Sequence, residues 1–177
     1  EAPDLLRWWD GAAWSDTELR ANEPDQHPSR NPMAARSRTL LRWTLAIVGV
    51  GLIGGSIAVP ARRRGLADHI LGVNHRASTR EYTLSAGLVD AAFATPGEAV
   101  GQADLVVFCT AVDAIANDVL SATPNYRPGT LITDAGSTKS AIVRALEGRL
   151  PAGVHFVGSH PLAGSEKQGP THADAEL

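Results

Sequence analysis

A glycine-rich turn between two apolar runs is the first segment of this chain whose residue types could do chemistry. The glycine-rich segment 49–55 follows the largely apolar residues 44–48 and leads into a second apolar run. A dinucleotide pyrophosphate needs a tight turn, a backbone without a side chain beside the phosphate, and a helix that packs closely on its strand and points its N-terminus at the anion. The residues expected to bind the cofactor here are Gly49, Gly51, Leu52, Ile53 and Gly54.

The residues after the next expected strand bear on the choice between NAD and NADP. A carboxylate about 20 residues past the glycines would bind the ribose hydroxyls and repel a 2′-phosphate, but this chain has Asn74 there. Arg76, two residues on, could pair with a phosphate through two N–H groups. This pattern favours NADP or the use of both cofactors. In the alternative, Arg76 is a solvated loop charge and Asn74 binds the ribose of NAD.

A second polar motif, Asp-Ala-Gly136-Ser137-Thr-Lys139, lies between an expected strand and an expected helix. In an open α/β sheet this edge binds ligands, so Gly136 is a candidate cofactor contact and Ser137 a candidate catalytic hydroxyl. Spacing alone favours a simpler interpretation, in which Ser137 only caps the helix. Lys139 has a comparable alternative as a surface charge.

His160 is the candidate general base. It follows a short expected strand within Gly-Ser-His160-Pro161, and a histidine side chain can accept or donate a proton in catalysis. A residue before proline is held extended, which suits a side chain that projects from the end of a strand. The alternative is a structural histidine, and the other five histidines have no comparable setting.

Composition excludes several classes of function. The net charge is −3 and the only basic block is 62–64, which argues against a nucleic-acid partner. The single cysteine, Cys109, excludes an internal disulfide, fits a reducing and hence cytoplasmic compartment, and is expected to be an unreactive core residue. No metal-ligand cluster or secretory signal is evident. Residues 43–61 are uncharged, but their glycines and Pro60 favour the phosphate loop over a membrane helix.

The alternation of strands and helices predicts a doubly wound α/β domain of the Rossmann type, with a mostly parallel sheet, over residues 44–177. Residues 1–38 are predicted to be poorly ordered or appended, with Met33 a plausible start and three tryptophans in 7–14 as a small aromatic module. The C-terminus lacks a stop signal and is expected to lie within a helix, so the domain is interpreted as truncated.

The element boundaries follow from apolar periodicity and turn residues. Pro60 is expected to kink or shorten the first helix. The expected strands are 44–50, 70–74, 104–108, 130–133 and 155–157. The expected helices are 52–64, 78–85, 96–100, 112–120 and 138–150.

Taken together, the three motifs resemble those of the prephenate/arogenate dehydrogenases: Gly-x-Gly-Leu-Ile-Gly-Gly-Ser, then Asp-x-Gly-Ser-x-Lys, then Gly-Ser-His-Pro-x-Ala-Gly-Ser-Glu-Lys-x-Gly. The resemblance covers residues 45–177. It implies that His160 takes the proton from the hydroxyl on the substrate ring, with Ser137 beside it and Glu166 ordering the pocket. It also implies that Thr110 lies by the ribose on the nicotinamide side.

By this resemblance the activity is the NAD- or NADP-dependent oxidative decarboxylation of prephenate or arogenate in tyrosine biosynthesis, by a cytoplasmic homodimer that needs no metal. The family's substrate-binding arginine and dimer contacts belong to a C-terminal helical domain, which this sequence does not contain. Ala111 replaces a usual proline, and Pro60 interrupts a usually unbroken helix. Two other hypotheses stay open: another small-substrate dehydrogenase, such as one for hydroxyacids, or a nucleotide-binding remnant without catalysis.

Overall fold

The computed structural model describes residues 5–6, 19–20 and 43–177 of the chain. Residues 42–177 form one compact unit. In the N-terminal unit, strands β1 (Leu5–Leu6) and β2 (Leu19–Arg20) pair antiparallel. The hypotheses about Met33 and the tryptophans fall outside the described residues.

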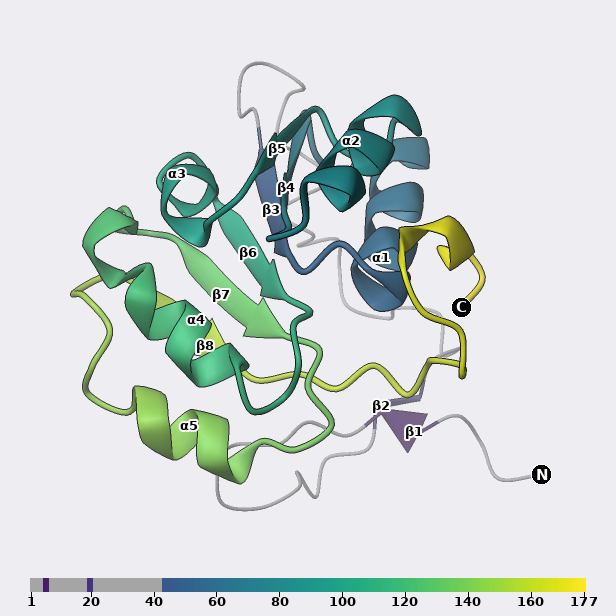
Figure 1. Ribbon diagram of the computed structural model, residues 1–177. Coiled ribbons are helices and arrows are strands. Elements are labelled where there is room, and N and C mark those ends of the chain that lie inside the picture. The colour runs from purple at the N-terminus through teal and green to yellow at the C-terminus, as the bar shows by residue number, and fades with distance from the viewer. Residues whose placement is uncertain (1–4, 7–18, 21–42) are drawn as a thin grey trace, which may run out of the picture. The chain divides into compact units, whose positions relative to one another are not determined.

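A six-stranded sheet forms the centre of the compact unit, and all of its strand pairs are parallel (Figure 1). The strand order is β5-β4-β3-β6-β7-β8, so the order reverses between β3 and β6, where the chain crosses from one half of the sheet to the other. The predicted doubly wound Rossmann-type fold is therefore confirmed. The strands are β3 Thr44–Val48, β4 His69–Val73, β5 Ala91–Phe93, β6 Leu105–Phe108, β7 Leu131–Asp134 and β8 His155–Val157.

Helices cover both faces of the sheet and bury two separate apolar clusters. Alternate side chains of β3 serve the two faces, because successive residues of a strand point to opposite sides. Leu45 and Ile47 pack with residues of the first helix, whereas Ala46 and Val48 pack with residues of the third, fourth and fifth. The helices are α1 Leu52–Arg63, α2 Ala77–Ser85, α3 Pro96–Val100, α4 Ile115–Ser121 and α5 Ser140–Leu146, with 3₁₀ turns η1 Thr123–Asn125 and η2 Pro170–His172.

Helix α1 runs through Pro60, so of the two expected effects of this proline the shortening does not occur, and the kink stays a prediction. Proline removes one backbone donor, but the buried Ala58 and Ala61 on either side of it hold the helix against the sheet. Gly65 ends the helix as expected: its φ is +59°, and the Leu66 N–H reaches back to the Ala61 carbonyl at 2.9 Å.

Several other boundaries differ from the sequence prediction. α5 is shorter at both ends. Before the helix, the Lys139 side chain turns back to Asp134 at the end of β7. After the helix, Gly148 has φ +66°. α4 begins at Ile115, three residues later than expected, and β5 was not expected at all. The predicted C-terminal helix is replaced by η2, which begins at Pro170 and packs on α1.

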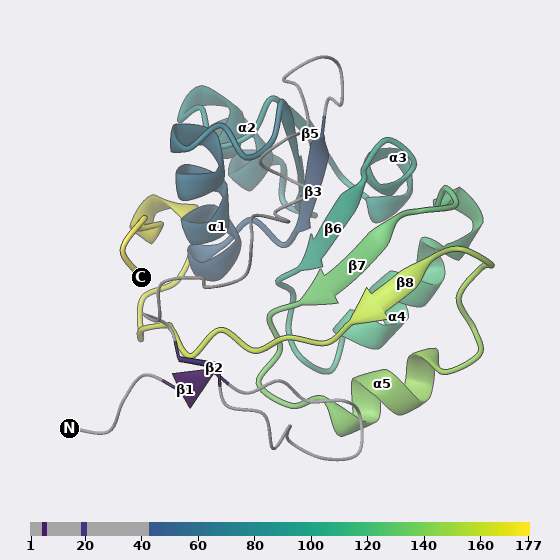
Figure 2. The same cartoon turned by 180° about the vertical axis from the view of Figure 1, so that it is seen from behind.

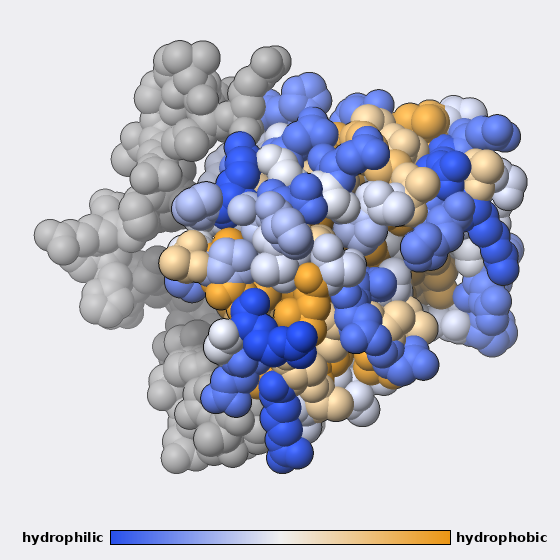
Figure 3. Space-filling view, turned by 60° about the vertical axis from the view of Figure 1, so that its left-hand side comes forward, coloured by the Kyte–Doolittle hydropathy of each residue, from blue (hydrophilic) through white to orange (hydrophobic). Residues whose placement is uncertain are grey.

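Apolar side chains reach the surface of the compact unit in several places. Figure 3 shows one face, on which apolar residues gather between charged ones. Val157 on β8 is 58% exposed and Leu131 on β7 is 39% exposed. Within the described residues β8 is an edge strand. In residues 43–177, together with the two short N-terminal strands, no helix is long and apolar enough to span a bilayer.

Candidate active site at the carboxyl edge of the sheet

The loops that carry the three motifs all leave the same edge of the sheet. Because every strand is parallel, their carboxyl ends lie together, and in a doubly wound sheet ligands bind at this edge. After β8 the chain turns and passes beneath the tips of β7 and β6 toward α1, as Figures 1 and 2 show from opposite sides. The segment that contains His160 therefore follows the edge at which the glycine turn begins.

The glycine turn between β3 and α1 is packed tightly on one side. Gly49 has φ +90°, and a Cβ there would lie 2.9 Å from the carbonyl carbon and oxygen of Cys109. A Cβ on Gly54 would lie 2.9 Å from the Ile47 side chain and would also clash with the Gly49 carbonyl. These two glycines allow the turn to fold against β6 and α1 to approach β3.

The other side of the turn is open. Among the described residues, a Cβ on Gly51 would meet no atom within 4 Å, and no side chain caps the N-terminus of α1. The amides of the first helical turn have no acceptor within the helix, and Leu52 and Ile53, half-buried, supply the first two of them. Free space beside Gly51 and uncapped amides fit a dinucleotide pyrophosphate.

Asn74 lies where the second strand of the nucleotide motif ends. With its amide oriented to satisfy both groups, it accepts a hydrogen bond from the Val50 N–H and donates one to the Val73 carbonyl, each at 3.2 Å. Asn74 thus ties β4 to the glycine turn. Arg76, at the N-cap of α2, is exposed.

Arg80 organises the same loop, and the sequence reasoning missed it. Its Nη1 donates to the carbonyls of Asn74 at 2.8 Å and His75 at 2.7 Å. An arginine one turn into a helix can reach back to the loop before it, and that spacing was the available signal. Arg80 therefore holds the backbone of the loop that leads to Arg76.

Thr110 follows β6 and is partly buried. Its hydroxyl donates to Asp118 Oδ2 of α4 at 2.7 Å, which leaves the oxygen lone pairs as the free hydrogen-bonding groups. Asp118 was not recognised from the sequence, because it lies within an ordinary helical stretch. Its carboxylate fixes the rotation of the Thr110 hydroxyl at the end of the strand.

Cys109, just before Thr110, is an unreactive thiol by its surroundings. Burial, together with the nearby negative charge of Asp134, raises its pKa to about 12. A thiol with so high a pKa holds almost no thiolate at neutral pH. This environment supports the expected structural role.

Both simple interpretations of the second motif are wrong. Ser137 is exposed and does not cap α5, whose N-cap is Lys139 without a side-chain hydrogen bond. Lys139 is no surface charge, since its side chain is 19% exposed and its Nζ forms an ion pair with Asp134. Gly136 is buried and donates its N–H to Asp134 Oδ2 at 2.9 Å. The motif is a loop folded around one buried carboxylate.

The third motif is attached to the second. Ser159 donates its N–H to Asp134 Oδ1 at 3.2 Å and its hydroxyl to the Asp134 carbonyl. The loops that carry Ser137 and His160 therefore begin at the same point. His160 and Glu166 are exposed, and within the described residues the structure records no hydrogen bond from either side chain or from that of Ser137.

Farther along, this segment reaches the glycine turn. A Cβ on Gly164 would lie 4.0 Å from the Ile53 side chain of α1. A Cβ on Gly55 would lie 2.7 Å from Ala173, and Ser56 accepts a hydrogen bond from the Asp174 N–H at 2.9 Å. The third motif is thus anchored at β7 at its start and approaches α1 at its end.

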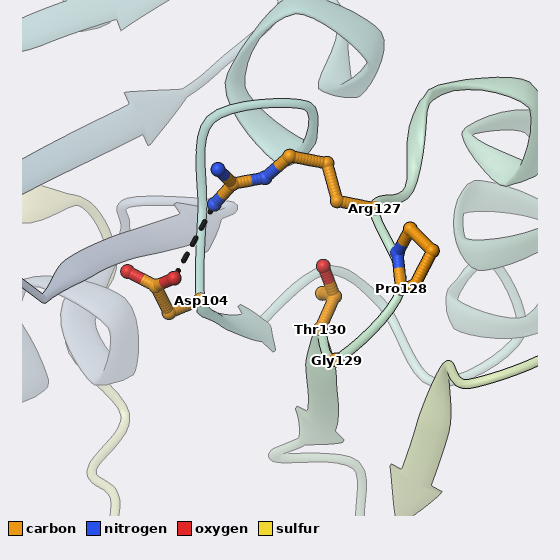
Figure 4. Close-up of a pocket in the computed structure, with 5 residues that line it drawn as sticks. All are labelled: Asp104, Arg127, Pro128, Gly129 and Thr130. Carbon is orange, nitrogen blue, oxygen red and sulfur yellow. Dashed lines mark hydrogen bonds and ion pairs between the residues drawn. The ribbon is translucent and has the colours of Figure 1, made fainter.

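A separate pocket lies at the opposite, amino edge of the sheet (Figure 4). Asp104 and Arg127 form an ion pair across it at 3.3 Å, and Asp104 also accepts the Thr44 N–H at 2.8 Å. The Thr130 hydroxyl donates to a backbone carbonyl. These groups satisfy one another and hold the amino ends of the strands, so the carboxyl edge is the candidate site.

Comparison with protein families agrees with the second and third motifs. A family model described as "Prephenate dehydrogenase, nucleotide-binding domain" matches residues 57–177. The chain is 36% identical over 137 residues to a prephenate dehydrogenase of Lactococcus lactis, covering 75% of this chain and 38% of that protein. It is 34% identical over 134 residues to a cyclohexadienyl dehydrogenase of Zymomonas mobilis, covering 75% of this chain and 45% of that protein.

Solved structures show the same relationship. A prephenate dehydrogenase from Aquifex aeolicus aligns with a TM-score of 0.69 and 30% identity over 75% of this chain and 48% of that one. A Synechocystis arogenate dehydrogenase aligns with a TM-score of 0.64 and 31% identity over 74% of this chain and 45% of that one. A second Aquifex structure, at 26% identity and a TM-score of 0.66 over 78% of this chain and 48% of that one, is a complex with hydroxyphenyl propionate and NAD+. This chain therefore spans less than half the length of each of these relatives.

Proposed function

Because the chain belongs to the prephenate dehydrogenase nucleotide-binding domain family, we propose that it is the cofactor-binding part of an enzyme that oxidatively decarboxylates prephenate or arogenate. The observation that carries the proposal is the meeting of the three motif loops at one sheet edge, with Ser159 bonded to Asp134 and Gly164 beside Ile53. The open side of the glycine turn and a histidine-bearing loop then lie along the same edge. This arrangement suits hydride transfer coupled to proton removal.

In the proposed reaction a nicotinamide dinucleotide held at this edge would supply the acceptor for the hydride that leaves C4 of the substrate ring. His160 takes the proton of the C4 hydroxyl, so that the C–O bond becomes a ketone as the hydride leaves. The bond between C1 and its carboxylate then breaks and carbon dioxide departs. The electron pair of that bond aromatises the ring, and the ketone oxygen gains a proton. Ser137 orients the hydroxyl or the imidazole, and Glu166 orders the surrounding pocket. One base and one aligned acceptor suffice for this chemistry.

The finer assignments of the cofactor contacts are part of the same proposal. The open side of Gly51 and the amides of α1 receive the pyrophosphate, and Thr110 lies by the ribose next to nicotinamide. Arg76 is exposed beside Asn74, so it is free to meet a 2′-phosphate. We therefore propose NADP or dual use rather than strict NAD use, with Gly136 shaping the nicotinamide side.

The domain organisation is a further part of the proposal. Residues 44–177 form the dinucleotide-binding domain, and the relatives are more than twice as long as the matched region. We propose that the substrate-binding cation and the dimer contacts lie in a helical domain outside this sequence. In this picture the enzyme is a cytoplasmic homodimer in tyrosine biosynthesis.

The test is an assay of the complete protein with prephenate, arogenate and a simple 2-hydroxyacid, each with NAD and NADP. Formation of reduced nicotinamide together with the aromatic product from prephenate or arogenate supports the proposal. Turnover of the hydroxyacid alone would favour the other class of dehydrogenase. Dinucleotide binding by fluorescence with no turnover of any substrate would favour the non-catalytic alternative.

A further inference from the structure

The carboxylate of Asp134 is the most enclosed charge among the described residues of the compact unit, at 0% exposure. It lies at the last position of β7, at the edge where the motif loops meet. A buried carboxylate is costly unless hydrogen bonds and a counter-charge compensate it. The partners of Asp134 therefore indicate which parts of the structure this carboxylate holds in place.

Those partners come from both motif loops. Oδ2 accepts the Gly136 N–H at 2.9 Å and pairs with the Lys139 ammonium, both from the loop that contains Ser137. Oδ1 accepts the Ser159 N–H at 3.2 Å, and the main-chain carbonyl of Asp134 accepts the Ser159 hydroxyl. One residue thus holds the start of the Ser137 loop and the residue immediately before His160.

Two neighbours reinforce this attachment. The Thr133 hydroxyl donates to the Val157 carbonyl at 2.7 Å and lies 3.2 Å from the Ser159 hydroxyl. A Cβ on Gly158 would lie 3.0 Å from Cδ of Lys139, so the lysine stem packs against the chain there. Each residue between the end of β8 and His160 is therefore held by the end of β7 or by Lys139.

We propose that Asp134, with Lys139 as its counter-ion, is the positioning residue for the catalytic histidine. The inference rests on the proposed role of His160 as base. Asp134 acts through Ser159, since its bonds fix the backbone from which the imidazole projects. A general base must stay within hydrogen-bond reach of its proton, and a displacement of about 1 Å can cost about a hundredfold in rate. A fixed carboxylate in the sheet supplies that restraint.

The central experiment is a double-variant cycle in the complete enzyme with Asp134→Asn and His160→Asn. Asp134→Asn should lower kcat by about tenfold to a hundredfold and leave dinucleotide affinity within about twofold. In the His160→Asn background the same change should cost less than about twofold, because Asp134 acts only through the histidine. If the kcat losses of the two single variants multiply in the double variant, the proposal is overturned. An unchanged kcat in Asp134→Asn alone would overturn it as well.

The matched control is Asp90→Asn, the same substitution at a carboxylate that accepts the Ile70 N–H at 2.7 Å near the amino edge of the sheet. It should change thermal stability but not kcat. If Asp134→Asn does not fold, Lys139→Met is the second variant, because it keeps the stem against Gly158 and removes the charge. It should reproduce the kcat loss in part, and full wild-type kcat in Lys139→Met would count against the proposal.

A readout that does not depend on activity separates this inference from the proposed function. The imidazole C–H signals of His160, assigned by comparison with His160→Asn, should shift or broaden in Asp134→Asn and stay unchanged in Asp90→Asn. If His160→Asn retains full kcat, the base assignment fails, whatever the spectra show. If His160→Asn is inactive but Asp134→Asn leaves both kcat and the His160 signals unchanged, the positioning role alone fails.

Discussion

The backbone of Gly49 lies directly against the carbonyl of Cys109, so that a Cβ on Gly49 would come within 2.9 Å of both its carbon and its oxygen. This contact joins the glycine turn after β3 to the end of β6, the two strands between which the sheet order reverses. Gly51, two residues on, has no neighbour within 4 Å of the Cβ position among the residues that the structure describes. The two glycines therefore serve different purposes: one closes the fold and the other leaves room for a ligand.

The first prediction separates these purposes. Gly49→Ala should lower the free energy of unfolding by about 2 kcal/mol or more, because φ is +90° and the methyl group meets backbone. Gly51→Ala, at φ −107°, should fold almost normally but weaken dinucleotide binding at least about tenfold, since the methyl would occupy the proposed pyrophosphate site. Thermal unfolding and fluorescence titration measure the two effects. A Gly51→Ala protein with unchanged dinucleotide affinity would place the phosphates elsewhere.

The second prediction concerns the cofactor. Arg76→Ala should weaken NADP by about tenfold or more and leave NAD nearly unchanged, because a charge-assisted contact contributes about 1.5–3 kcal/mol. Asn74→Asp should shift the preference toward NAD in the same way. The control is Arg80→Ala, which removes the bonds to the Asn74 and His75 carbonyls and should weaken both cofactors. If Arg76→Ala lowers the affinities for NAD and NADP equally, Arg76 is only a solvated charge on the loop.

The third prediction tests the base. In the complete enzyme His160→Asn should lower kcat by about a hundredfold or more and leave dinucleotide affinity nearly unchanged, because only proton transfer is lost. His155→Asn is the matched control, since His155 is exposed at the start of β8, away from the carboxyl edge. Steady-state kinetics on both variants decide the matter. A His160→Asn enzyme with near-wild-type kcat contradicts the assignment.

The fourth prediction is a pH dependence. Burial acts to raise the pKa of Asp90, but the Ile70 N–H and the Arg62 guanidinium outweigh it and hold the pKa below its ordinary value. The carboxylate therefore stabilises the fold above the unfolded-state pKa of about 3.9, and this contribution disappears as the pH falls through the lower folded-state value. Asp90→Asn should cost up to about 1 kcal/mol at neutral pH, since water screens the pair. Denaturant titrations should show that the difference in unfolding free energy between the wild type and Asp90→Asn becomes smaller in acid. A difference that becomes larger in acid would contradict the prediction.

The fifth prediction concerns the Cys109 thiol. With its pKa raised to about 12, it should resist alkylation in the folded protein at neutral pH and react only on unfolding. Mass spectrometry after iodoacetamide treatment, with and without denaturant, measures this. Rapid labelling of the native protein would mean that the strand end opens on the timescale of the reaction.

Local patterns in the sequence were sufficient for most of the fold. The apolar run before Gly49 predicted β3, and the continuous apolar stretch 105–108, within the expected strand 104–108, predicted a strand covered by helices on both faces. Gly65 predicted the end of α1 because a positive φ there is local geometry. β5 was missed because Ala91–Phe93 is too short to show a period, and the expected C-terminal helix failed because Pro170 starts a 3₁₀ turn.

What the sequence determined by itself is the order of its motifs and the glycine turn, because turn conformation and strand alternation depend on residues close together in the chain. Only the tertiary structure decided the partners of Asp134, since Ser159 lies 25 residues away and meets it only when β7 and β8 pair. The tertiary structure also shows that Lys139, which the sequence alone suggested as a surface charge, is the counter-ion of a buried carboxylate. A buried charge takes its partners from whatever the fold brings within reach, and no local pattern specifies that choice.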